Sequence, residues 1–162
     1  MSVEDKIYCV DQAGFVAASK RCEGCDCSPD RARPKVIVIC GSSRFVDIMA
    51  VVCWLLERDE GVIAMALHLL PQWYGAGGDG CPEDHLAEHE GIAAQMDELH
   101  LRKIDLADEI FVVNRADYIG DSTRREVEYA RRLGKPIRWY NNEPNPIKQK
   151  VEAMLTAWLE SA

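Results

Sequence analysis

The sequence places a carboxylate where parallel α/β sheets bind ligands. The apolar run EIFVVN, residues 109–114, has the length and branched side chains of a buried strand. After a short polar loop, residues 121–123 open an amphipathic helix that is expected to end at Gly134. Ligands of open α/β sheets bind beyond the carboxyl ends of the strands. Glu126, expected in the first turn of this helix, could therefore act as a nucleophile or general base on a small polar ligand.

The same glutamate has a second interpretation. Thr123 and Glu126 have the spacing of a capping box, in which the glutamate bonds back to the amide of the N-cap residue. The local sequence by itself favours capping. The polar side chains crowded at the strand end, Asp121, Ser122 and Thr123, favour a ligand site instead. Both interpretations stay open at this point.

A second polar turn, GSSRF at residues 41–45, follows the apolar run KVIVIC. Free N–H groups at the start of the next helix, with the hydroxyls of Ser42 and Ser43, can bind an anion. Arg44 would add a charge-assisted bond. The alternative is that one of the serines only caps the helix. The predicted ligand-binding residues at the two strand ends are Gly41, Ser42, Ser43, Arg44, Phe45, Asn114, Asp121, Ser122 and Thr123.

A long helix is expected from Glu83 to about Leu106. His85 and His89 have the i, i+4 spacing of paired metal ligands, but the glutamate of H-E-x-x-H is missing, which favours a solvated helix face. Asp97 and His100 are one turn apart, and they are the candidates on this helix to reach the pocket and assist catalysis.

Seven cysteines are a high count for a chain of this length. Cys40 and Cys53 lie in apolar runs and are interpreted as small buried hydrophobic residues. Cys22, Cys25 and Cys27 lie in a polar segment and include the C-x-x-C spacing of zinc ligands. Because the usual second C-x-x-C pair is missing, they are weak metal candidates and ordinary thiols are favoured.

Composition excludes several partners. The net charge of −8, from 27 acidic and 19 basic residues, argues against binding to a nucleic-acid polymer. No apolar run approaches the ~20 residues of a membrane span, and the first residues form no apolar signal core, so a cytoplasmic protein without membrane contact is expected. The dinucleotide fingerprint G-x-G-x-x-G is absent, and no cofactor is predicted.

The pattern divides the chain into a short cysteine-containing extension, residues 1–33, and an α/β domain, residues 34–162. The extension could contain two short strands, KIYCV and GFVAA. In the domain, apolar runs alternate with helical patterns, which predicts a flavodoxin-like or Rossmann-like doubly wound sheet of about five parallel strands. The glycine-rich segment 71–82 has the character of an active-site loop.

Two segments of this domain resemble a known family. The run LHLRKIDLADEIFVVN, followed by YIGDSTRREVEYARRLGKPI, resembles the nucleoside 2-deoxyribosyltransferase superfamily over about residues 35–140. The strongest part is the pattern E-x-x-Y-A-x-x-x-G-K-P, from Glu126 to Pro136. The resemblance implies that Glu126 attacks the anomeric carbon of a nucleoside or nucleotide and forms a glycosyl-enzyme, which water or a second base resolves. It also implies that Ser42, Ser43 and Arg44 hold the sugar or phosphate, and that the protein is a homo-oligomer.

The sequence departs from the family pattern in two places. His100 stands where the family often has an aspartate, and Asp97, one turn earlier, could replace it. Residues 122–125 stand where the family often has glycines, and the two bulkier arginines among them could narrow the pocket, select a phosphorylated ligand or mark a loss of catalysis. The alternatives are therefore a nucleotide-binding sensor that performs no chemistry, and an interaction protein whose N-terminal cysteines hold zinc.

Overall fold

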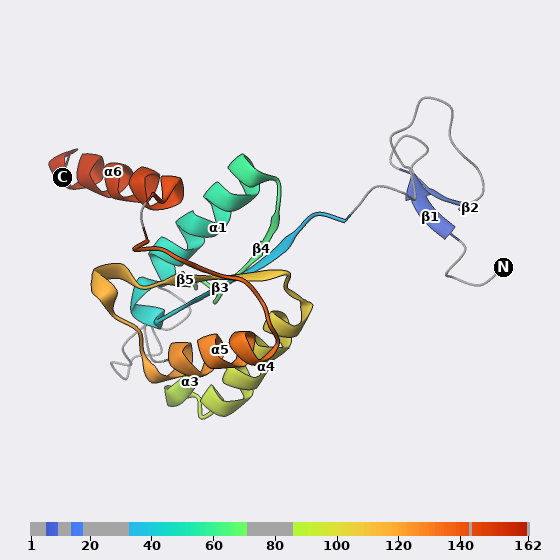
Figure 1. The fold of residues 1–162 in the computed structure, drawn as a ribbon, viewed down its shortest axis with the longest axis horizontal. Coiled ribbons are helices and arrows are strands. Elements are labelled where there is room, and N and C mark those ends of the chain that lie inside the picture. Colours follow the sequence, from blue (N-terminus) through green and yellow to red (C-terminus); the bar gives the residue numbers. More distant parts are fainter. Residues whose placement is uncertain (1–5, 10–13, 18–32, 71–85, 143, 162) are drawn as a thin grey trace. The chain divides into compact units, whose positions relative to one another are not determined.

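The computed structural model describes residues 6–9, 14–17, 33–70, 86–142 and 144–161 (Figure 1). The chain divides into two compact units, residues 1–33 and 34–162. In the first unit, β1 (Lys6–Cys9) pairs antiparallel with β2 (Gly14–Ala17), which confirms the two short strands expected there. Within the described ranges, no helix is both long and apolar enough to cross a bilayer.

The second unit is built on a parallel sheet. Its strands lie in the order β4 (Ile63–Met65), β3 (Val36–Gly41), β5 (Glu109–Val113) and β6 (Ile137–Trp139). The α/β class and the parallel sheet are as predicted, and the arrangement is compatible with a Rossmann-like fold. The described residues contribute four strands, where about five were expected. The chain leaves β3 for one edge of the sheet and returns on its other side with β5, which makes the space between these two strands the topological switch point.

Helices cover both faces of the sheet (Figure 1). The helices α1 (Val46–Glu60) and α6 (Pro146–Ser161) pack on one face, and α4 (Ala93–Leu106) and α5 (Asp121–Arg132) pack on the other. Alternate residues of each central strand point to opposite faces. Burial on both faces explains why the central strands are continuous apolar runs. The strand residues facing α1 and α6 are Ile37, Ile39, Phe111 and Val113, and those facing α4 and α5 are Val38, Cys40, Ile110 and Val112.

Glycines end two of the helices on the α4–α5 face. Gly134 has a φ of +67° directly after α5, as predicted for its C-terminus. The prediction of one long helix from Glu83 to Leu106 is wrong in its described part. Gly91, with a φ of +71°, ends a short helix α3 (Leu86–His89), and the N–H of Ile92 bonds to the carbonyl of Ala87 at 2.8 Å. The left-handed conformation of Gly91 interrupts the helix, so that α4 is a separate helix.

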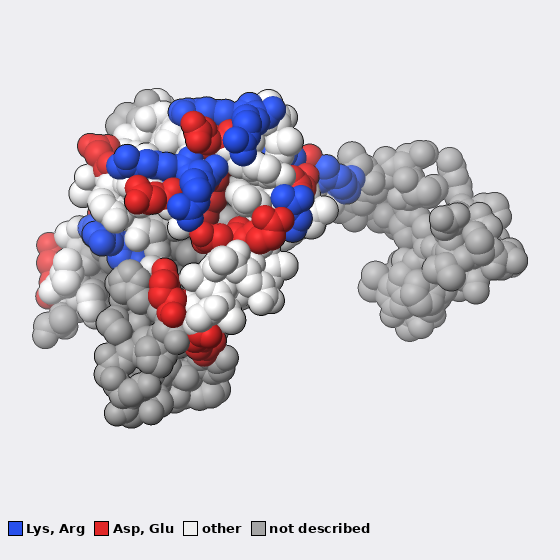
Figure 2. All heavy atoms as spheres, turned by 90° about the horizontal axis from the view of Figure 1, so that it is seen from below, with Lys and Arg blue, Asp and Glu red and all other residues white. Residues whose placement is uncertain are grey.

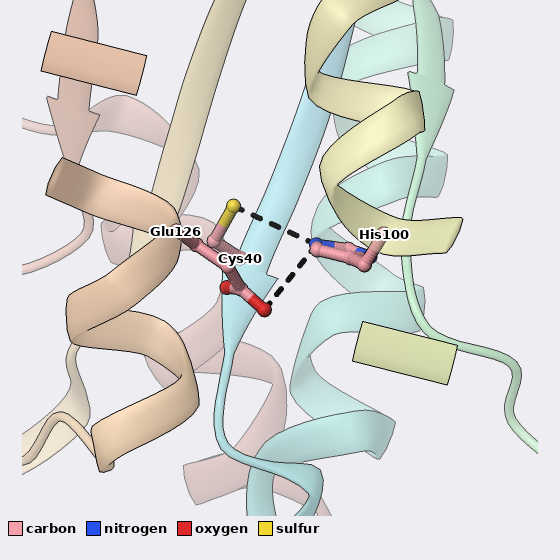
Figure 3. A group of neighbouring side chains, drawn as sticks. All are labelled: Cys40, His100 and Glu126. Carbon is pink, nitrogen blue, oxygen red and sulfur yellow. Dashed lines mark hydrogen bonds and ion pairs between the residues drawn. The ribbon is translucent and has the colours of Figure 1, made fainter. Parts of the chain in front are cut away.

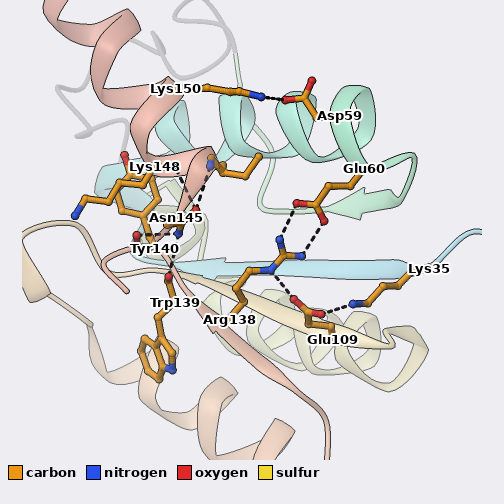
Figure 4. Close-up of polar contacts among 11 residues, drawn as sticks. Lys35, Asp59, Glu60, Glu109, Arg138, Trp139, Tyr140, Asn145, Lys148 and Lys150 are labelled. Carbon is orange, nitrogen blue, oxygen red and sulfur yellow. Dashed lines mark hydrogen bonds and ion pairs between the residues drawn. The ribbon is translucent and has the colours of Figure 1, made fainter. Parts of the chain in front are cut away.

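The last helix, α6, begins at Pro146, whose fixed φ suits the first turn of a helix. Asn145 precedes Pro146, and its Oδ1 accepts hydrogen bonds from the N–H groups of Ile147 and Lys148, at 3.1 and 3.2 Å. Its amide nitrogen donates to the carbonyls of Trp139 and Tyr140 (Figure 4). This side chain therefore caps α6 and ties it to the end of β6.

A network of ion pairs closes the amino ends of the strands (Figure 4). Glu109, the first residue of β5, is 7% exposed and bonds to Lys35 and to Nε of Arg138, the latter at 2.7 Å. Arg138 also contacts both carboxylate oxygens of Glu60 at 2.7 and 3.1 Å. Burial by itself would raise the pKa of Glu109, but the bonds from Lys35 and Arg138 outweigh burial and lower that pKa. The network thus joins the sheet to the end of α1.

Acid should weaken this network. Because the pKa of Glu109 is lower in the folded state, its ion pairs contribute stability above about pH 4.3, and this contribution is lost as the pH falls through the folded-state value. Glu109→Gln is expected to lower the free energy of unfolding by about 1–3 kcal/mol at neutral pH. Below about pH 4.3, the free energy of unfolding of this variant should fall less steeply with decreasing pH than that of the wild type. Urea unfolding across pH measures both effects.

Glu98→Gln is the matched control for this prediction. Glu98 pairs with Arg102 on the surface and is 61% exposed, so its loss should change neither stability nor the acid limb measurably. Superimposable pH curves for Glu109→Gln and the wild type would contradict the stabilising role of the network.

The surface charge on the α4–α5 side is mixed. Figure 2, which views the molecule from below Figure 1, shows acidic and basic side chains lying next to one another on this face. Asp97 pairs with Arg125 of α5, and Asp105 pairs with Arg102 of α4. Basic and acidic groups thus alternate among the described residues of this face.

Candidate functional site

Three side chains that could take part in catalysis or metal binding meet between the sheet and the helices α4 and α5 (Figure 3). Cys40 comes from β3, His100 from α4 and Glu126 from α5. The Sγ of Cys40 lies 3.7 Å from Nε2 of His100, and this nitrogen lies 3.8 Å from Oε1 of Glu126. The three residues are 0%, 3% and 7% exposed, respectively. They are called the Cys–His–Glu cluster below.

Polar residues occupy apolar positions of the helix pattern here. The buried side of α5 carries Thr123, Val127 and Ala130 together with Glu126, and the buried residues of α4 are His100 and Ile104. These spacings form the stripe that a helix turns toward a core. A carboxylate in such a stripe loses its hydration and is costly unless other groups compensate it. Glu126 is therefore held in its position by the packing of α5 on β3 and β5.

The capping interpretation of Glu126 is wrong. The helix α5 begins at Asp121, its N-cap residue is Gly120, and no side chain makes a capping hydrogen bond there. Thr123 is the third residue of the helix and is 1% exposed, so it is not the N-cap. Glu126 consequently lies in the second turn, not in the first as expected, and its carboxylate points into the interior rather than back to the helix start.

Burial dominates the electrostatics of the cluster. It raises the pKa of Glu126 to about 7; Asp97 adds to this rise, whereas a hydrogen bond from Cys40 and the charge of Arg125 oppose it. Burial also raises the pKa of the Cys40 thiol well above its ordinary value, and the charge of Glu126 adds to that rise. Burial, helped by Lys103, lowers the pKa of His100 to about 4. At neutral pH, the cluster thus contains a thiol, a neutral imidazole and a carboxyl group whose pKa of about 7 leaves both of its protonation states populated.

The hydrogen bonding of the cluster is incomplete. Among the described residues, Nδ1 of His100 and Oε2 of Glu126 are buried polar atoms without a hydrogen-bond partner. An unsatisfied buried polar group costs about 1–3 kcal/mol. Native proteins tolerate few such groups, and those that persist are often sites of function.

A pocket of about 280 Å³ opens between α4 and α5, and Glu126 forms part of its wall. At its rim, Asp97 and Arg125 form an ion pair of 2.7 Å, and Arg125 also bonds to the hydroxyl of Ser122 at 3.0 Å. Asp97 and Glu126 therefore line one pocket, while His100 lies beneath it. The full set of lining residues is Asp97, Leu101, Ser122, Arg125, Glu126, Glu128, Tyr129 and Arg132.

The GSSRF turn lies at the carboxyl end of β3 and meets the loop that follows β5. The guanidinium of Arg44 lies 4.1 Å from the centre of the Tyr118 ring, and Phe45 meets the same ring edge-on at 6.2 Å. Ser42 precedes a short 3₁₀ turn, Ser43–Phe45, and its side chain makes no capping hydrogen bond. The two predicted polar loops thus converge at the switch point between β3 and β5.

The remaining predicted ligand-binding residues lie in the core, join strand ends or are exposed. A Cβ atom at Gly41 would lie 2.9 Å from Sδ of Met49, so this glycine permits close packing of β3 on α1. Oδ1 of Asn114 accepts the N–H of Asn141 at 3.0 Å, which joins the ends of β5 and β6. Asp121 is exposed, and Thr123 is buried in the core side of α5.

Sequence reasoning missed the role of Cys40 in the cluster. Its burial was predicted, but its neighbours come from positions 60 and 86 residues further along the chain, in two different helices. The alternation of β3 was the available signal, because it turns Cys40 to the same face as Val38 and hence toward α4 and α5. The predicted metal candidates Cys22, Cys25 and Cys27 lie outside the described residues, as do His85 and the glycine-rich segment 71–82.

The chain was compared with known proteins by sequence and by structure. No protein-family model, no curated protein and no solved structure matches it significantly. The resemblance to nucleoside 2-deoxyribosyltransferases therefore stays a prediction, and the function has to be inferred from the pocket and the side chains around it.

Proposed function

We propose that the flavodoxin-like α/β unit is a nucleoside or nucleotide N-glycosidase or deoxyribosyltransferase, with Glu126 as its nucleophile. The observation that carries this proposal is the position of the Glu126 carboxylate. It is 93% buried by packing, lines a pocket, and has one oxygen without a partner among the described residues. A desolvated carboxylate at the wall of a pocket is suited to attack a carbon that gains positive charge.

The proposed reaction proceeds in two steps. A carboxylate oxygen of ionised Glu126 bonds to the anomeric carbon as the N-glycosidic bond breaks, and the bonding electron pair leaves with the base, which takes up a proton from water. Water, or a second base, then attacks the anomeric carbon and releases Glu126. The partial positive charge of the oxocarbenium-like transition state is stabilised by the nearby carboxylate.

The neighbours of Glu126 have distinct roles in this scheme. Asp97 lies at the pocket rim in an ion pair with Arg125, where it can orient the departing base by accepting a hydrogen bond. His100 is neutral near pH 7 and buried beside Oε1, so it positions the nucleophile.

The sugar or phosphate end of the ligand is assigned to the GSSRF turn. This turn lies at the switch point, where open α/β sheets bind ligands. Arg44 stacks on Tyr118 there, and Ser42 and Ser43 directly precede it in the same turn. A second copy of the chain is proposed to complete the pocket, which is open between α4 and α5.

Removal of the nucleophile tests the proposal directly. Glu126→Gln keeps the shape of the side chain but cannot form the glycosyl ester, so base release should be abolished. Ligand affinity should stay within about tenfold, or ~1.4 kcal/mol. The measurement is incubation with a panel of nucleosides and their monophosphates, followed by chromatography for free base.

Two comparisons make that measurement decisive. Glu98→Gln, which changes an exposed carboxylate on α4, should keep the wild-type turnover. Retained turnover in Glu126→Gln would reject Glu126 as the nucleophile. Ligand binding by the wild type without release of any base would instead support the non-catalytic nucleotide sensor.

A second variant tests the phosphate assignment. Arg44→Ala should weaken monophosphates more than the matching nucleosides, because a charge-assisted bond worth about 1.5–3 kcal/mol is lost. This corresponds to a difference of about 10–150-fold between the two ligand classes. Isothermal titration with each pair of ligands measures it. Arg58→Ala, which removes an exposed arginine paired with Asp59 on α1, is the control. Equal weakening of both ligand classes by Arg44→Ala would contradict the assignment of the phosphate to this turn.

A further inference from the structure

The Cys–His–Glu cluster has the geometry of a metal site. One ligand atom from each of its residues, a sulfur, a nitrogen and a carboxylate oxygen, lies within 4.8 Å of the other two. The Sγ–Nε2 separation of 3.7 Å is a long, weak contact of the kind that sulfur makes, and the Nε2–Oε1 separation of 3.8 Å is too long for a hydrogen bond. Zinc bonds of about 2.3 Å to sulfur and 2.0–2.1 Å to nitrogen give tetrahedral edges of about 3.5 Å. The three side chains of Figure 3 therefore need to move only slightly to share one ion.

The types of the ligand atoms select the metal. Magnesium and calcium prefer sites made of oxygen atoms alone. Thiolate, imidazole and carboxylate together are ligands of zinc, a borderline-soft ion that accepts all three. We propose that Cys40, His100 and Glu126 bind a zinc ion through Sγ, Nε2 and the carboxylate.

The charge of the cluster agrees with a dication. A Cys40 thiolate and a Glu126 carboxylate would place two negative charges in a region where the three side chains are at most 7% exposed. Zinc brings two positive charges and makes the site neutral, which removes the cost of burying two like charges side by side. The charged groups nearest the cluster are Asp97 and Lys103 on α4 and Arg125 on α5, and Arg125 is already paired with Asp97.

A second observation points to a missing partner. Oε2 of Glu126 is buried without a hydrogen bond among the described residues, and a metal-bound carboxylate would use this oxygen or its neighbour. Glu126 also lines the pocket, so an ion in the cluster would have a route to solvent. Three protein ligands and one position open to water or a substrate is the arrangement of catalytic rather than structural zinc sites.

The zinc proposal rests on other observations than the proposed glycosidase and competes with it for Glu126. A zinc-bound Glu126 cannot also attack an anomeric carbon, so the metal-loaded protein should not release base, whatever the metal-free protein does. Metal binding is measured directly, and its failure or success is therefore distinguishable from that of base release.

Cobalt(II) provides the test, because it replaces zinc and reports its ligands by colour. The full-length chain with Cys9, Cys22, Cys25 and Cys27 changed to serine serves as the parent, so that the thiols of residues 1–33 do not contribute. One equivalent of cobalt per chain is expected to give intense visible bands of a tetrahedral site and a near-ultraviolet sulfur-to-cobalt band. Zinc should displace the cobalt, and both sets of bands should then disappear.

Substitutions in this parent identify the ligands. Cys40→Ser should remove the sulfur-to-cobalt band. Loss of an outer partner of a metal ligand already costs about 10–100-fold in affinity, so Cys40→Ser, His100→Gln and Glu126→Gln should each weaken zinc binding by at least ~100-fold. Cys53→Ser changes a half-buried thiol of α1 outside the cluster and should leave spectrum and affinity unchanged.

The outcomes that overturn the proposal are specific. Absence of a stoichiometric cobalt spectrum in the parent, or an unchanged sulfur-to-cobalt band in Cys40→Ser, would exclude the site. If circular dichroism shows that Cys40→Ser does not fold, His100→Gln and Glu126→Gln decide instead, because wild-type zinc affinity in both would exclude these ligands.

Discussion

The burial of Glu126 in the apolar side of α5 constrains the structure around it. A helix that packs on a sheet with Thr123, Val127 and Ala130 must carry the intervening carboxylate into the same interface. Desolvation then raises its pKa, and the nearest side chains, Cys40 and His100, stabilise the carboxylate only partly, because Oε2 stays without a partner among the described residues. Such a position lowers stability, and groups with strongly shifted pKa values occur most often at functional sites.

A second glutamate shows what a purely structural carboxylate looks like in the same sheet. Glu109 is 7% exposed, as is Glu126, but it lies at the amino end of β5 between Lys35 and Arg138. Equal burial thus produces opposite shifts: the pKa of Glu109 is lowered by its cations, and that of Glu126 is raised. The two ends of the strands are therefore specialised. Ion pairs fasten the amino ends, and the incompletely satisfied cluster lies toward the carboxyl ends, near the switch point.

The sequence predicted those parts of the fold that depend on local patterns. Apolar runs located the central strands, Gly134 located the end of α5, and the order of elements predicted the parallel sheet. The break at Gly91 was missed because the apolar spacing continues across it, and only the backbone conformation reveals it. The cluster was predicted in part: Glu126 and His100 were candidates, whereas Cys40 joins them through register and packing, which connect distant residues and leave no short motif in the sequence.

The two proposed roles of Glu126 exclude each other, because both use the lone pairs of its carboxylate. As a nucleophile, the carboxylate must be ionised while surrounded by a neutral imidazole and a neutral thiol; as a zinc ligand, it shares its charge with an ion that also ionises Cys40. Burial disfavours the ionised carboxylate that a nucleophile needs. In the zinc-bound state, burial favours the metal, because a dication neutralises two buried anions. The pocket reaches Glu126 in either case. Zinc availability would then decide which chemistry this side of the sheet performs, since one carboxylate cannot serve both at once.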